Sequence, residues 1–450
     1  MISDDIKTDL AKTLPAGRVV FDFNDRPEYT KDATELVFTP DALFFAETED
    51  EIIAALKWCR RHGLPVVLRG AGTGYSGGAL AVKGGLLLST ERMKNIVIDR
   101  DHRIATAGPG AITGDIMAAA ERQGLFYPPD PASYLESTIG GNVAENAGGL
   151  RCKKYGVTKD YVVAVRGITA DGDIVTLDNN CPFGLMDVII GSEGTLFIVT
   201  SVTLRLIPLP SPGRTIQAVF PRAVDAAAVV AEVTAAGIVP MVMEFMDRDA
   251  IACSNQYDPG HRIEEGEAML LFETDGRGAD SDADRIKDIC GTYTPSVLRE
   301  ASGADERETL WQTRRNLSKA VKETAHSKTA EDVCVPPSRL PELVAYVEQL
   351  RRRLRVRVNC YGHAGDGNLH VNFLGMTGSA GEAEDTQRGV AMLFEKTLAL
   401  GGTLTGEHGI GITKKDFLAR EFDPPTITFM RRLKAVFDQA DILNPGKMFV

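Results

Sequence analysis

The stretch Tyr361-Gly-His-Ala-Gly-Asp-Gly-Asn-Leu-His-Val-Asn372 carries the strongest structural and chemical signal in the chain. Asp-Gly is favoured in two-residue type I′ hairpin turns, because both central residues of such a turn need a positive φ. With Asp366-Gly367 as this turn, the strand predicted at 356–360 pairs with the one that follows, and His363 faces His370. Directly opposed side chains on one face have Cβ atoms about 4.5–5.5 Å apart. The sequence therefore predicts two imidazoles close enough to share a metal ion.

A packed pair of core histidines is the alternative for this hairpin. That pair would need hydrogen-bond partners for four ring nitrogens. The chain has only seven histidines, so two of them opposite each other favour the metal site.

The segment Thr403-Leu-Thr-Gly-Glu-His-Gly-Ile-Gly411 supplies candidates for the rest of such a site. Glu407 would add a carboxylate ligand, and a His₂-carboxylate set leaves a position open for water or substrate, as catalytic sites do. Such a set suits zinc, manganese or iron(II). Neighbouring side chains of an extended segment point to opposite sides, so His408 would approach a substrate instead. Taken alone, Gly-Glu-His-Gly is equally compatible with a surface turn.

Three glycine-rich loops lie in the N-terminal half, at 65–78, 127–149 and 191–198. The first contains Gly72-Thr-Gly-Tyr-Ser-Gly77, but a dinucleotide-binding fingerprint requires a helix directly after it, and residues 79–89 have no helical period. A loop of exposed backbone N–H groups can bind phosphate without a helix, and a flexible surface loop is the alternative. Glycine is conformationally costly unless backbone must approach something closely. Together the three loops indicate a long, flat ligand with a pyrophosphate.

These loops resemble the flavin-binding domain of the vanillyl-alcohol oxidase/p-cresol methylhydroxylase family. The motifs His363-x-Gly-Asp-Gly-Asn-x-His370 and Gly406-Glu-His-Gly409 resemble its D-2-hydroxyacid dehydrogenase branch, which includes D-lactate dehydrogenases, the glycolate oxidase catalytic subunit and D-2-hydroxyglutarate dehydrogenase. The resemblance extends from residue 38 to the C-terminus. It implies an α+β fold, with a two-part FAD-binding domain of the p-cresol methylhydroxylase type and a substrate (cap) domain with a ferredoxin-like sheet and a helical C-terminus.

The expected layout follows from the resemblance and from the linker prolines Pro208, Pro210 and Pro212. It consists of an N-terminal helical segment at 1–37, the FAD-binding domain at 38–208, and a substrate domain with the metal site and a C-terminal segment that returns to FAD at 209–450. The substrate domain should begin with a β-α-β-β-α order. Its predicted elements are strand 214–220, helix 222–237, strand 239–246, strand 268–274 and helix 281–290.

The resemblance also assigns the FAD contacts, residue by residue. They are Arg69, Gly70, Ala71, Gly72, Thr73, Gly74, Ser76, Gly77, Pro129, Asp130, Ser137, Thr138, Gly140, Gly141, Asn146, Gly148, Gly149, Glu193, Gly194, Ile198 and Asn444. Some relatives bind FAD covalently through a histidine in the first loop, and this chain has none between His62 and His102. FAD is therefore expected to bind noncovalently.

For the substrate site, the resemblance implies His363, His370 and Glu407 as ligands of one divalent metal, zinc first and manganese or iron as alternatives, with His408 as the base. Arg314 matches an arginine that holds the substrate carboxylate, since its planar fork suits bidentate binding. Its neighbour Arg315 is the alternative for this role. Both arginines are also compatible with a solvated helix face that has no functional role. Asn372, on the same strand face as His370, and Lys328, whose spacing differs from the family pattern, are further candidates.

The implied function is oxidation of a D-2-hydroxy acid (D-lactate, glycolate or D-2-hydroxyglutarate) to the 2-oxo acid. His408 would take the hydroxyl proton, and FAD would take the electrons by hydride transfer or through a carbanion. A quinone, a cytochrome, an electron-transfer flavoprotein or an iron–sulfur partner subunit is the expected acceptor. The alternatives are a non-redox FAD enzyme of the ether-lipid synthase type, a flavoprotein subunit of a multi-subunit glycolate- or lactate-oxidising complex, and a flavin-free metallohydrolase.

Composition narrows the partners and the location. A net charge of −12 argues against nonspecific nucleic-acid binding. Seven scattered cysteines without C-x₂-C spacing argue against an iron–sulfur cluster in this chain, and they indicate a reducing compartment. No signal peptide and no run of about 18 apolar residues is evident. We expect a cytoplasmic protein without a transmembrane segment, able to associate peripherally with a membrane and to form a homodimer.

Overall fold

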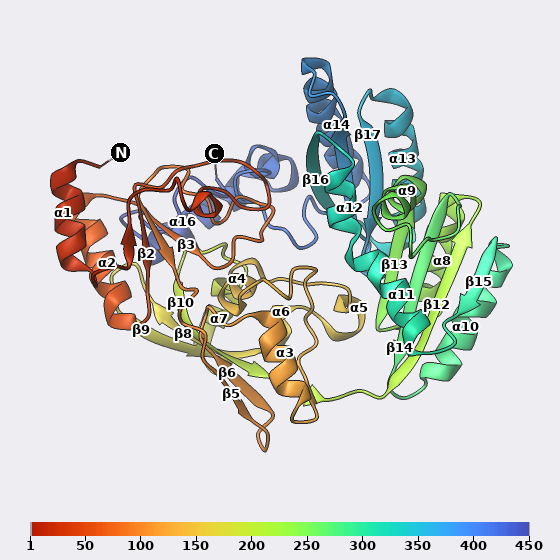
Figure 1. Ribbon diagram of the computed structural model, residues 1–450, viewed down its shortest axis with the longest axis horizontal. Helices are drawn as coiled ribbons and strands as arrows, with labels where there is room; N and C mark the ends of the chain where they lie inside the picture. Colours follow the sequence, from red (N-terminus) through yellow and green to blue (C-terminus); the bar gives the residue numbers. More distant parts are fainter. Residues whose placement is uncertain (1, 450) are drawn as a thin grey trace. The chain divides into compact units, whose positions relative to one another are not determined.

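The computed structural model describes residues 2–449, which divide into two compact units. Unit 1 contains the chain up to Gly148, then Val157–Leu209, and the C-terminal part from Glu407. Unit 2 contains Gly149–Gly156 and Pro210–Gly406. Both units combine helices and sheets, which confirms the predicted α+β class (Figure 1).

The first sheet of unit 1 has the order β1-β2-β4-β3. Its strands are β1 Val19–Val20, β2 Ala42–Phe45, β3 Val66–Arg69 and β4 Leu86–Ser89. Strands β2, β4 and β3 are parallel, and helix α2 (Glu49–His62) makes the crossover from β2 to β3. Thr48 and Glu51 form a capping box at the start of α2, and Gly63, with φ 62°, ends it.

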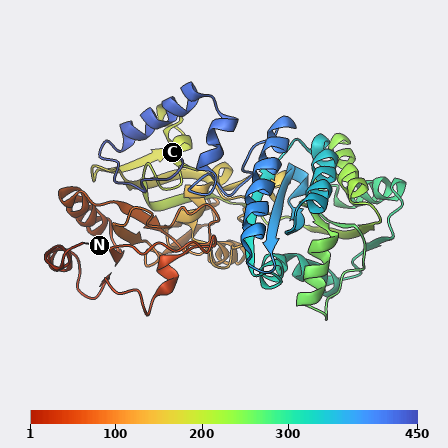
Figure 2. The ribbon, with the colours of Figure 1, turned by 90° about the horizontal axis from the view of Figure 1, so that it is seen from above.

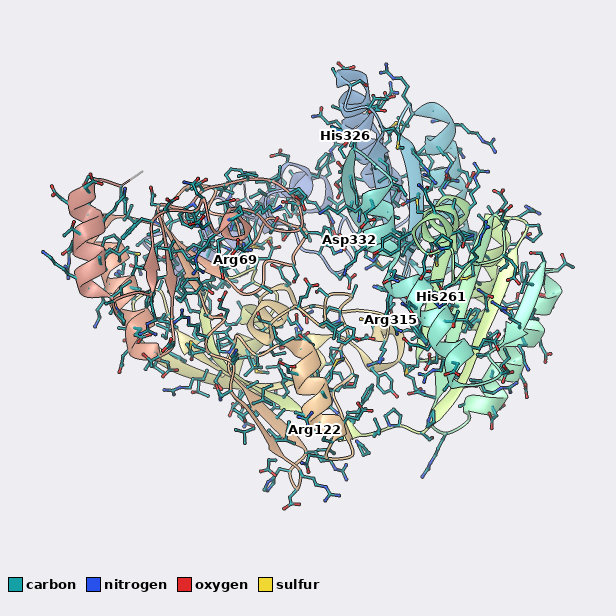
Figure 3. All side chains as sticks on the ribbon, in the orientation of Figure 1. Arg69, Arg122, His261, Arg315, His326 and Asp332 are labelled. Carbon is teal, nitrogen blue, oxygen red and sulfur yellow. The ribbon has the colours of Figure 1, made fainter. Side chains whose placement is uncertain are left out.

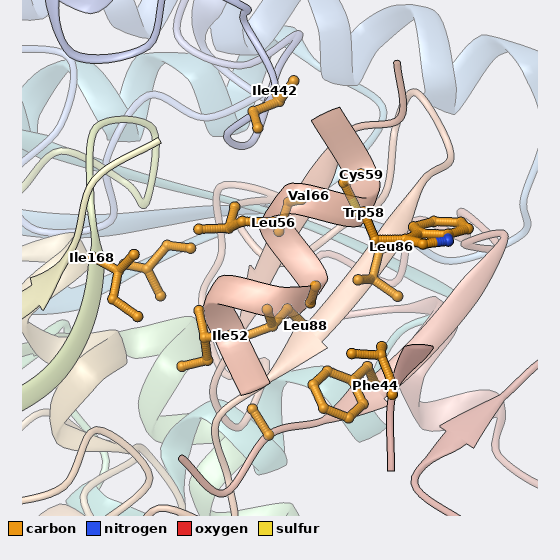
Figure 4. Close-up of a cluster of buried hydrophobic side chains, with 14 of the residues drawn as sticks. Phe44, Ile52, Leu56, Trp58, Cys59, Val66, Leu86, Leu88, Ile168 and Ile442 are labelled. Carbon is orange, nitrogen blue, oxygen red and sulfur yellow. The ribbon is translucent and has the colours of Figure 1, made fainter. Parts of the chain in front are cut away.

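One side of α2 supplies the core above this sheet. Ile52, Leu56 and Trp58 are almost completely buried against Phe44 and Leu86 (Figure 4). The Trp58 indole nitrogen donates to the Asp9 carboxylate at 2.7 Å, so its polar atom also has a partner.

The second sheet of unit 1 is antiparallel, with the order β5-β6-β10-β8-β9. Its strands are β5 Ile96–Asp99, β6 Ile104–Ala107, β8 Val162–Ile168, β9 Ile174–Asp178 and β10 Ile198–Arg205. The remaining elements of unit 1 are α1 Asp4–Thr13, α3 Thr113–Glu121, α4 Ile139–Glu145, α6 Thr158–Tyr161, α7 Leu185–Ile189, α15 Leu418–Glu421, α16 Pro424–Phe437, η1 Pro27–Thr30, η2 Pro182–Gly184, η5 Lys415–Phe417 and the paired β7 Leu125–Phe126 and β11 Ile207–Pro208.

The C-terminal segment returns to the N-terminal strands within unit 1 (Figure 2). The Val66 backbone N–H donates to the Ile442 carbonyl at 2.7 Å, and the Asn444 N–H donates to the Val66 carbonyl at 2.8 Å. The last residues are therefore held beside β3 and the loop that follows it.

Unit 2 is built on one antiparallel sheet with the order β15-β12-β14-β13-β17-β18-β16. Its strands are β12 Pro212–Phe220, β13 Val242–Asp247, β14 Ala268–Asp275, β15 Val297–Glu300, β16 Ser327–Cys334, β17 Arg357–Gly362 and β18 Asn368–Gly375. Strand β14 lies between β12 and β13, which is the split β-α-β arrangement of ferredoxin-like sheets. The predicted β-α-β-β-α order is confirmed by these strands with α8 and α10, although helix α9 adds an element between β13 and β14.

Helices cover both faces of this sheet (Figure 1). One face carries α8 Ala223–Ala235, α10 Ala279–Thr292, α13 Leu340–Arg353 and α14 Ala380–Ala399. The other carries α9 Arg248–Tyr257 and α12 Leu317–Glu323, with α11 Ala304–Arg315 leading into α12. The remaining short elements are α5 Cys152–Tyr155, η3 Pro337–Arg339 and η4 Ala364–Asp366.

The predicted two-residue turn at Asp366-Gly367 is wrong. Tyr361, not His363, pairs with His370, and a longer loop through the 3₁₀ turn η4 joins β17 to β18. Of the two predicted turn residues, Gly367 has a positive φ, 78°, and Asp366 does not. A Cβ at Gly367 would lie 1.8 Å from the Val335 carbonyl oxygen. The Val335 N–H donates to the Gly367 carbonyl at 3.0 Å. Contacts with the chain that follows β16, which local sequence does not show, therefore select the longer loop.

Within residues 2–449, no helix is long and apolar enough to span a membrane.

Candidate active site

Polar side chains gather on the face of the unit 2 sheet that α9, α11 and α12 cover. Four adjacent strands contribute: Glu244 from β13, Tyr361 from β17, His370 from β18 and Asp332 from β16. Tyr361 and Asp332 are the two cross-strand partners of His370. Since opposed side chains of neighbouring strands share a face, His370 has a ring on one side and a carboxylate on the other.

His363, His370 and Glu407 come together as a candidate metal centre. One ligand atom from each residue lies within 4.8 Å of those of the other two. The centroids of the two imidazole rings are 5.3 Å apart, and the ring planes are perpendicular. Both histidines are buried, and Glu407 is half-buried. Two imidazoles and a carboxylate are a donor set that zinc, manganese and iron(II) accept. The predicted ligands are thus brought together, although by a different hairpin register from the one expected.

Glu407 follows directly on Gly406, whose backbone is fixed inside unit 2. The Gly406 N–H donates to an Asp332 carboxylate oxygen at 2.8 Å. A Cβ at Gly406 would lie 2.2 Å from the side-chain nitrogen of Asn368, so the close approach requires glycine. Asp332 (labelled in Figure 3) is completely buried and also accepts from the Thr405 hydroxyl at 3.2 Å. These contacts hold the segment that presents Glu407.

Glu244 bridges a predicted metal ligand and the predicted substrate arginine. One carboxylate oxygen lies 2.7 Å from Nδ1 of His363, and the other accepts from Nε of Arg314 at 2.6 Å. Burial alone would raise the pKa of Glu244, but the charges of Arg314 and His363 hold it below its ordinary value. Glu244 is thus the anionic partner of the Arg314 guanidinium, and its other oxygen faces Nδ1 of His363.

Arg314 is buried, and its guanidinium carbon lies 5.2 Å from the centre of the Tyr361 ring. Only its Nε has a hydrogen-bond partner among the described residues, so its two terminal amino groups are available to a ligand. Arg315 (labelled in Figure 3), by contrast, is exposed and forms an ion pair with exposed Glu308. Of the two adjacent arginines, Arg314 is the one that the structure directs toward the candidate metal ligands.

Asn372 and Lys328 lie on the same face of the sheet as His370. Asn372 is completely buried and donates to the Asn359 side chain at 2.8 Å, while its own carbonyl oxygen has no partner within residues 2–449. Lys328 is half-buried, with its ammonium 3.3 Å from the Ser318 hydroxyl on α12. The substrate roles of both residues stay predictions.

The first glycine-rich loop of unit 1 has glycines of two kinds. A Cβ at Gly70 would lie 2.2 Å from the Thr138 hydroxyl, and Gly72 has a φ of 74°, so packing explains the first glycine and backbone conformation the second. Gly74 meets nothing within 4 Å and has no positive φ. In the second loop, a Cβ at Gly141 would meet only the Thr138 hydroxyl, at 3.4 Å. Neither packing nor backbone strain explains Gly74 or Gly141, which fits a ligand that approaches the backbone there.

The guanidinium of Arg69 (labelled in Figure 3) contacts the N-terminal segment, and the expected cofactor contact of this residue stays a prediction. It donates to the carbonyls of Lys31 at 2.9 Å and Glu28 at 2.8 Å. Thr138 caps helix α4 and accepts from the Gly141 N–H. Arg69 and Thr138 therefore shape the two loops.

Glu193 holds the backbone that follows His408. Its two carboxylate oxygens accept from the N–H groups of Ile410 and Gly411, both at 2.7 Å. The His408 ring stacks on Tyr75, with centroids 4.9 Å apart and an interplanar angle of 24°. The candidate base thus lies against the first glycine-rich loop.

Asn444 and Lys447 connect the chain terminus to the same loop. The Asn444 amide donates to the carbonyls of Glu193 at 2.8 Å and Gly78 at 3.0 Å, and the Lys447 ammonium donates to Gly78. Burial lowers the pKa of Lys447 to about 7.

Glu145 is a functional candidate that the sequence did not single out. Burial and the neighbouring Glu193 raise its pKa well above the ordinary value, and one of its oxygens is buried without a partner in the described chain. Because Glu193 receives two backbone N–H groups and this oxygen of Glu145 receives none, Glu193 is the better placed of the pair to hold a negative charge. Tyr75 and Glu244 were missed as well, since an isolated aromatic or acidic residue has no local pattern.

Comparisons with known proteins cover almost the whole chain. Residues 209–448 match the model of the C-terminal domain of FAD linked oxidases, and residues 40–178 match an FAD binding domain. The glycolate oxidase subunit GlcD of Bacillus subtilis is 36% identical over 465 residues, covering 100% of this chain and 97% of the relative. A D-lactate dehydrogenase of Anaerostipes hadrus is 33% identical, covering 91% and 89%.

Two kinds of solved structure share the fold. p-Cresol methylhydroxylase with substrate bound matches with a TM-score of 0.83 at 14% identity, covering 100% of this chain and 98% of that one. Alkyldihydroxyacetonephosphate synthase matches with a TM-score of 0.76 at 17% identity, covering 99% and 86%.

Proposed function

We propose a function from the premise that this chain belongs to the FAD-linked oxidases and is an FAD-linked oxidoreductase of the glycolate oxidase and D-lactate dehydrogenase type. The proposed reaction is the oxidation of a small D-2-hydroxy acid, such as D-lactate, glycolate or D-2-hydroxyglutarate, to its 2-oxo acid. It is metal-dependent, and FAD binds noncovalently. The observation that carries the proposal is the set of His363, His370 and Glu407, with Arg314 connected to it through Glu244.

Each residue has a task that its chemistry suits. The terminal amino groups of Arg314 bind the substrate carboxylate, because a planar guanidinium meets two carboxylate oxygens at once. His408, the residue after Glu407, accepts the proton of the substrate hydroxyl. His363, His370 and Glu407 would hold one divalent ion, zinc in the first place. That ion would polarise the substrate oxygens, and FAD would take up the electrons.

The non-redox alternative is not favoured. The likeness to alkyldihydroxyacetonephosphate synthase, at 17% identity, concerns the fold alone. The relatives at 36% and 33% identity, by contrast, are named as a glycolate oxidase subunit and a D-lactate dehydrogenase. A quinone, a cytochrome, an electron-transfer flavoprotein or an iron–sulfur partner subunit is the proposed electron acceptor.

The test is an anaerobic screen for bleaching of the flavin absorption by D- and L-2-hydroxy acids, with and without a strong chelator. We expect at least one D-2-hydroxy acid or glycolate to bleach the flavin, chelation to abolish bleaching, and zinc or manganese to restore it. Flavin that is reduced equally well after complete metal removal would refute the metal dependence. Flavin that no 2-hydroxy acid reduces would refute the substrate class.

A further inference from the structure

We infer that Glu244 is a positioning residue that aligns both a metal ligand, His363, and the substrate-binding Arg314. The inference rests on the proposed function and assigns the element that couples its metal site to its substrate site. Glu244 lies on β13, His363 lies in the loop after β17, and Arg314 lies near the end of α11.

The contacts of Glu244 use both of its oxygens. The side chain is completely buried, with one oxygen 2.7 Å from Nδ1 of His363 and the other 2.6 Å from Nε of Arg314. His363 and Arg314 are themselves only 4% and 5% exposed, so all three side chains of this contact are buried. A buried guanidinium without its carboxylate would be strongly destabilising.

The contact to His363 fixes which ring nitrogen can bind an ion. An ionised carboxylate only accepts hydrogen bonds, so Nδ1 of His363 must carry the proton. The lone pair is then on Nε2, the other ring nitrogen. A carboxylate behind a ligating histidine fixes its tautomer and orientation, and loss of such a partner typically weakens metal binding about 10- to 100-fold.

The contact to Arg314 fixes the direction of the guanidinium. Glu244 occupies Nε, and the Tyr361 ring lies 5.2 Å from the guanidinium carbon. The two terminal amino groups are therefore left as a pair for a planar anion. Without Glu244, the arginine would have more rotational freedom and would lose entropy on binding substrate.

Replacement of Glu244 by glutamine keeps the size and shape of the side chain but removes its negative charge. In Glu244→Gln, one oxygen remains an acceptor, and the amide NH₂ then faces either the His363 N–H or the Arg314 N–H. Facing the Arg314 N–H, the amide NH₂ makes a clash of donors. Facing His363, it can be accepted only if Nδ1 gives up its proton, and the tautomer with the proton on Nε2 has no lone pair there for an ion.

Glu273 supplies a matched control in the same sheet. It is buried on β14 and accepts from Arg307 and from the Trp311 indole nitrogen, both on α11. Glu273→Gln therefore loosens the helix that carries Arg314, but Glu273 has no contact with His363 among the described residues.

The experiment measures zinc affinity, by competition with a chromogenic chelator, and the dissociation constant of the hydroxy acid that bleaches the wild type, in the FAD-loaded full chain. We expect Glu244→Gln to weaken zinc binding about 10- to 100-fold and to weaken hydroxy-acid binding as well, whereas Glu273→Gln keeps wild-type zinc affinity. Wild-type zinc affinity in Glu244→Gln, or equal losses in both variants, would overturn the inference.

A measurement on the wild type covers the case in which Glu244→Gln does not fold. The chain has seven histidines, so selective ¹⁵N-histidine labelling gives a tractable NMR spectrum. His363, assigned by its absence in His363→Gln, is expected to be protonated at Nδ1 without metal. A proton on Nε2 alone would overturn the inference. A wild type that binds neither zinc nor any hydroxy acid would instead refute the proposed function, before any variant is compared.

Discussion

Replacement of Arg314 by lysine tests the proposed substrate site most directly. Lysine keeps the positive charge, but its ammonium is a compact point charge without the planar fork of arginine. In the structure, Arg314 uses Nε for Glu244 and leaves two terminal amino groups for a ligand. A lysine at this position cannot serve Glu244 and both oxygens of a carboxylate in the same geometry.

The expected loss follows from the contacts. Bidentate binding of a carboxylate supplies two charge-assisted hydrogen bonds, and each hydrogen bond to a charged group is worth about 1.5–3 kcal/mol. Loss of one of them weakens substrate binding about 10- to 150-fold. The limiting rate of flavin reduction should fall less, because the proposed acceptor of the hydroxyl proton is His408, which the substitution does not change.

Stopped-flow flavin reduction without oxygen, across a range of hydroxy-acid concentrations, separates the dissociation constant from the limiting rate. Arg315→Lys is the control, because Arg315 is exposed and pairs with exposed Glu308. It should bind substrate as the wild type does. An unchanged dissociation constant in Arg314→Lys, with folding verified by thermal melting, or an equal loss in Arg315→Lys, would refute the assignment of Arg314.

Three further outcomes follow from the structure. His408→Ala should retain FAD and metal yet reduce flavin at least about 100-fold more slowly in single turnovers; an unchanged rate would exclude it as the base. Gly74→Ala should melt within about 0.5 kcal/mol of the wild type but bind FAD about tenfold or more weakly in equilibrium titration, whereas Gly140→Ala, whose Cβ would lie 2.7 Å from Cβ of Pro109, should lose stability itself. Hydrogen bonds from Arg166 hold the pKa of Glu49 below its ordinary value of 4.5. The pair therefore stabilises the fold above that pH and is lost as pH falls through the folded pKa. Glu49→Gln should accordingly be less stable at pH 7, by about 1 kcal/mol or less since Arg166 is exposed, and the difference should disappear in acid denaturation titrations as the pH falls through the folded pKa of Glu49.

Local patterns predicted the features that depend on local chemistry. The glycine-rich loops, the order of elements in the ferredoxin-like sheet and the three metal-ligand candidates were all visible as short motifs or as changes of period. Each of these signals lies within a continuous stretch of chain. In such a stretch, the positions of glycines, prolines and alternating apolar residues indicate the local backbone conformation.

Glu244 shows why the rest could not be predicted. It is an acidic residue in the middle of the strand Val242–Asp247, whose only other acidic residue is Asp247 at its end, and such a position usually indicates a solvated strand edge or a structural ion pair. Its partners His363 and Arg314 are 119 and 70 residues away along the chain. Only the sheet order, in which β13 lies beside β17, brings the carboxylate to the histidine. The contact of Val335 with Gly367, which favours the longer hairpin loop, likewise joins residues that are distant along the chain and could not be predicted from local sequence.

The observed hairpin register orients the two histidines of the candidate metal centre in different ways. Opposed positions on a ladder would have aligned two histidines through the backbone alone. In the structure only His370 is held by strand pairing, with Tyr361 and Asp332 on either side, whereas His363 approaches from the loop with its ring perpendicular to that of His370. A loop residue has no ladder to orient it, so its ring direction must come from a side-chain contact. Glu244 supplies such a contact through Nδ1 of His363, and it also holds Arg314. The longer loop therefore makes the geometry of this candidate metal ligand depend on the same carboxylate as the geometry of Arg314, the proposed substrate arginine.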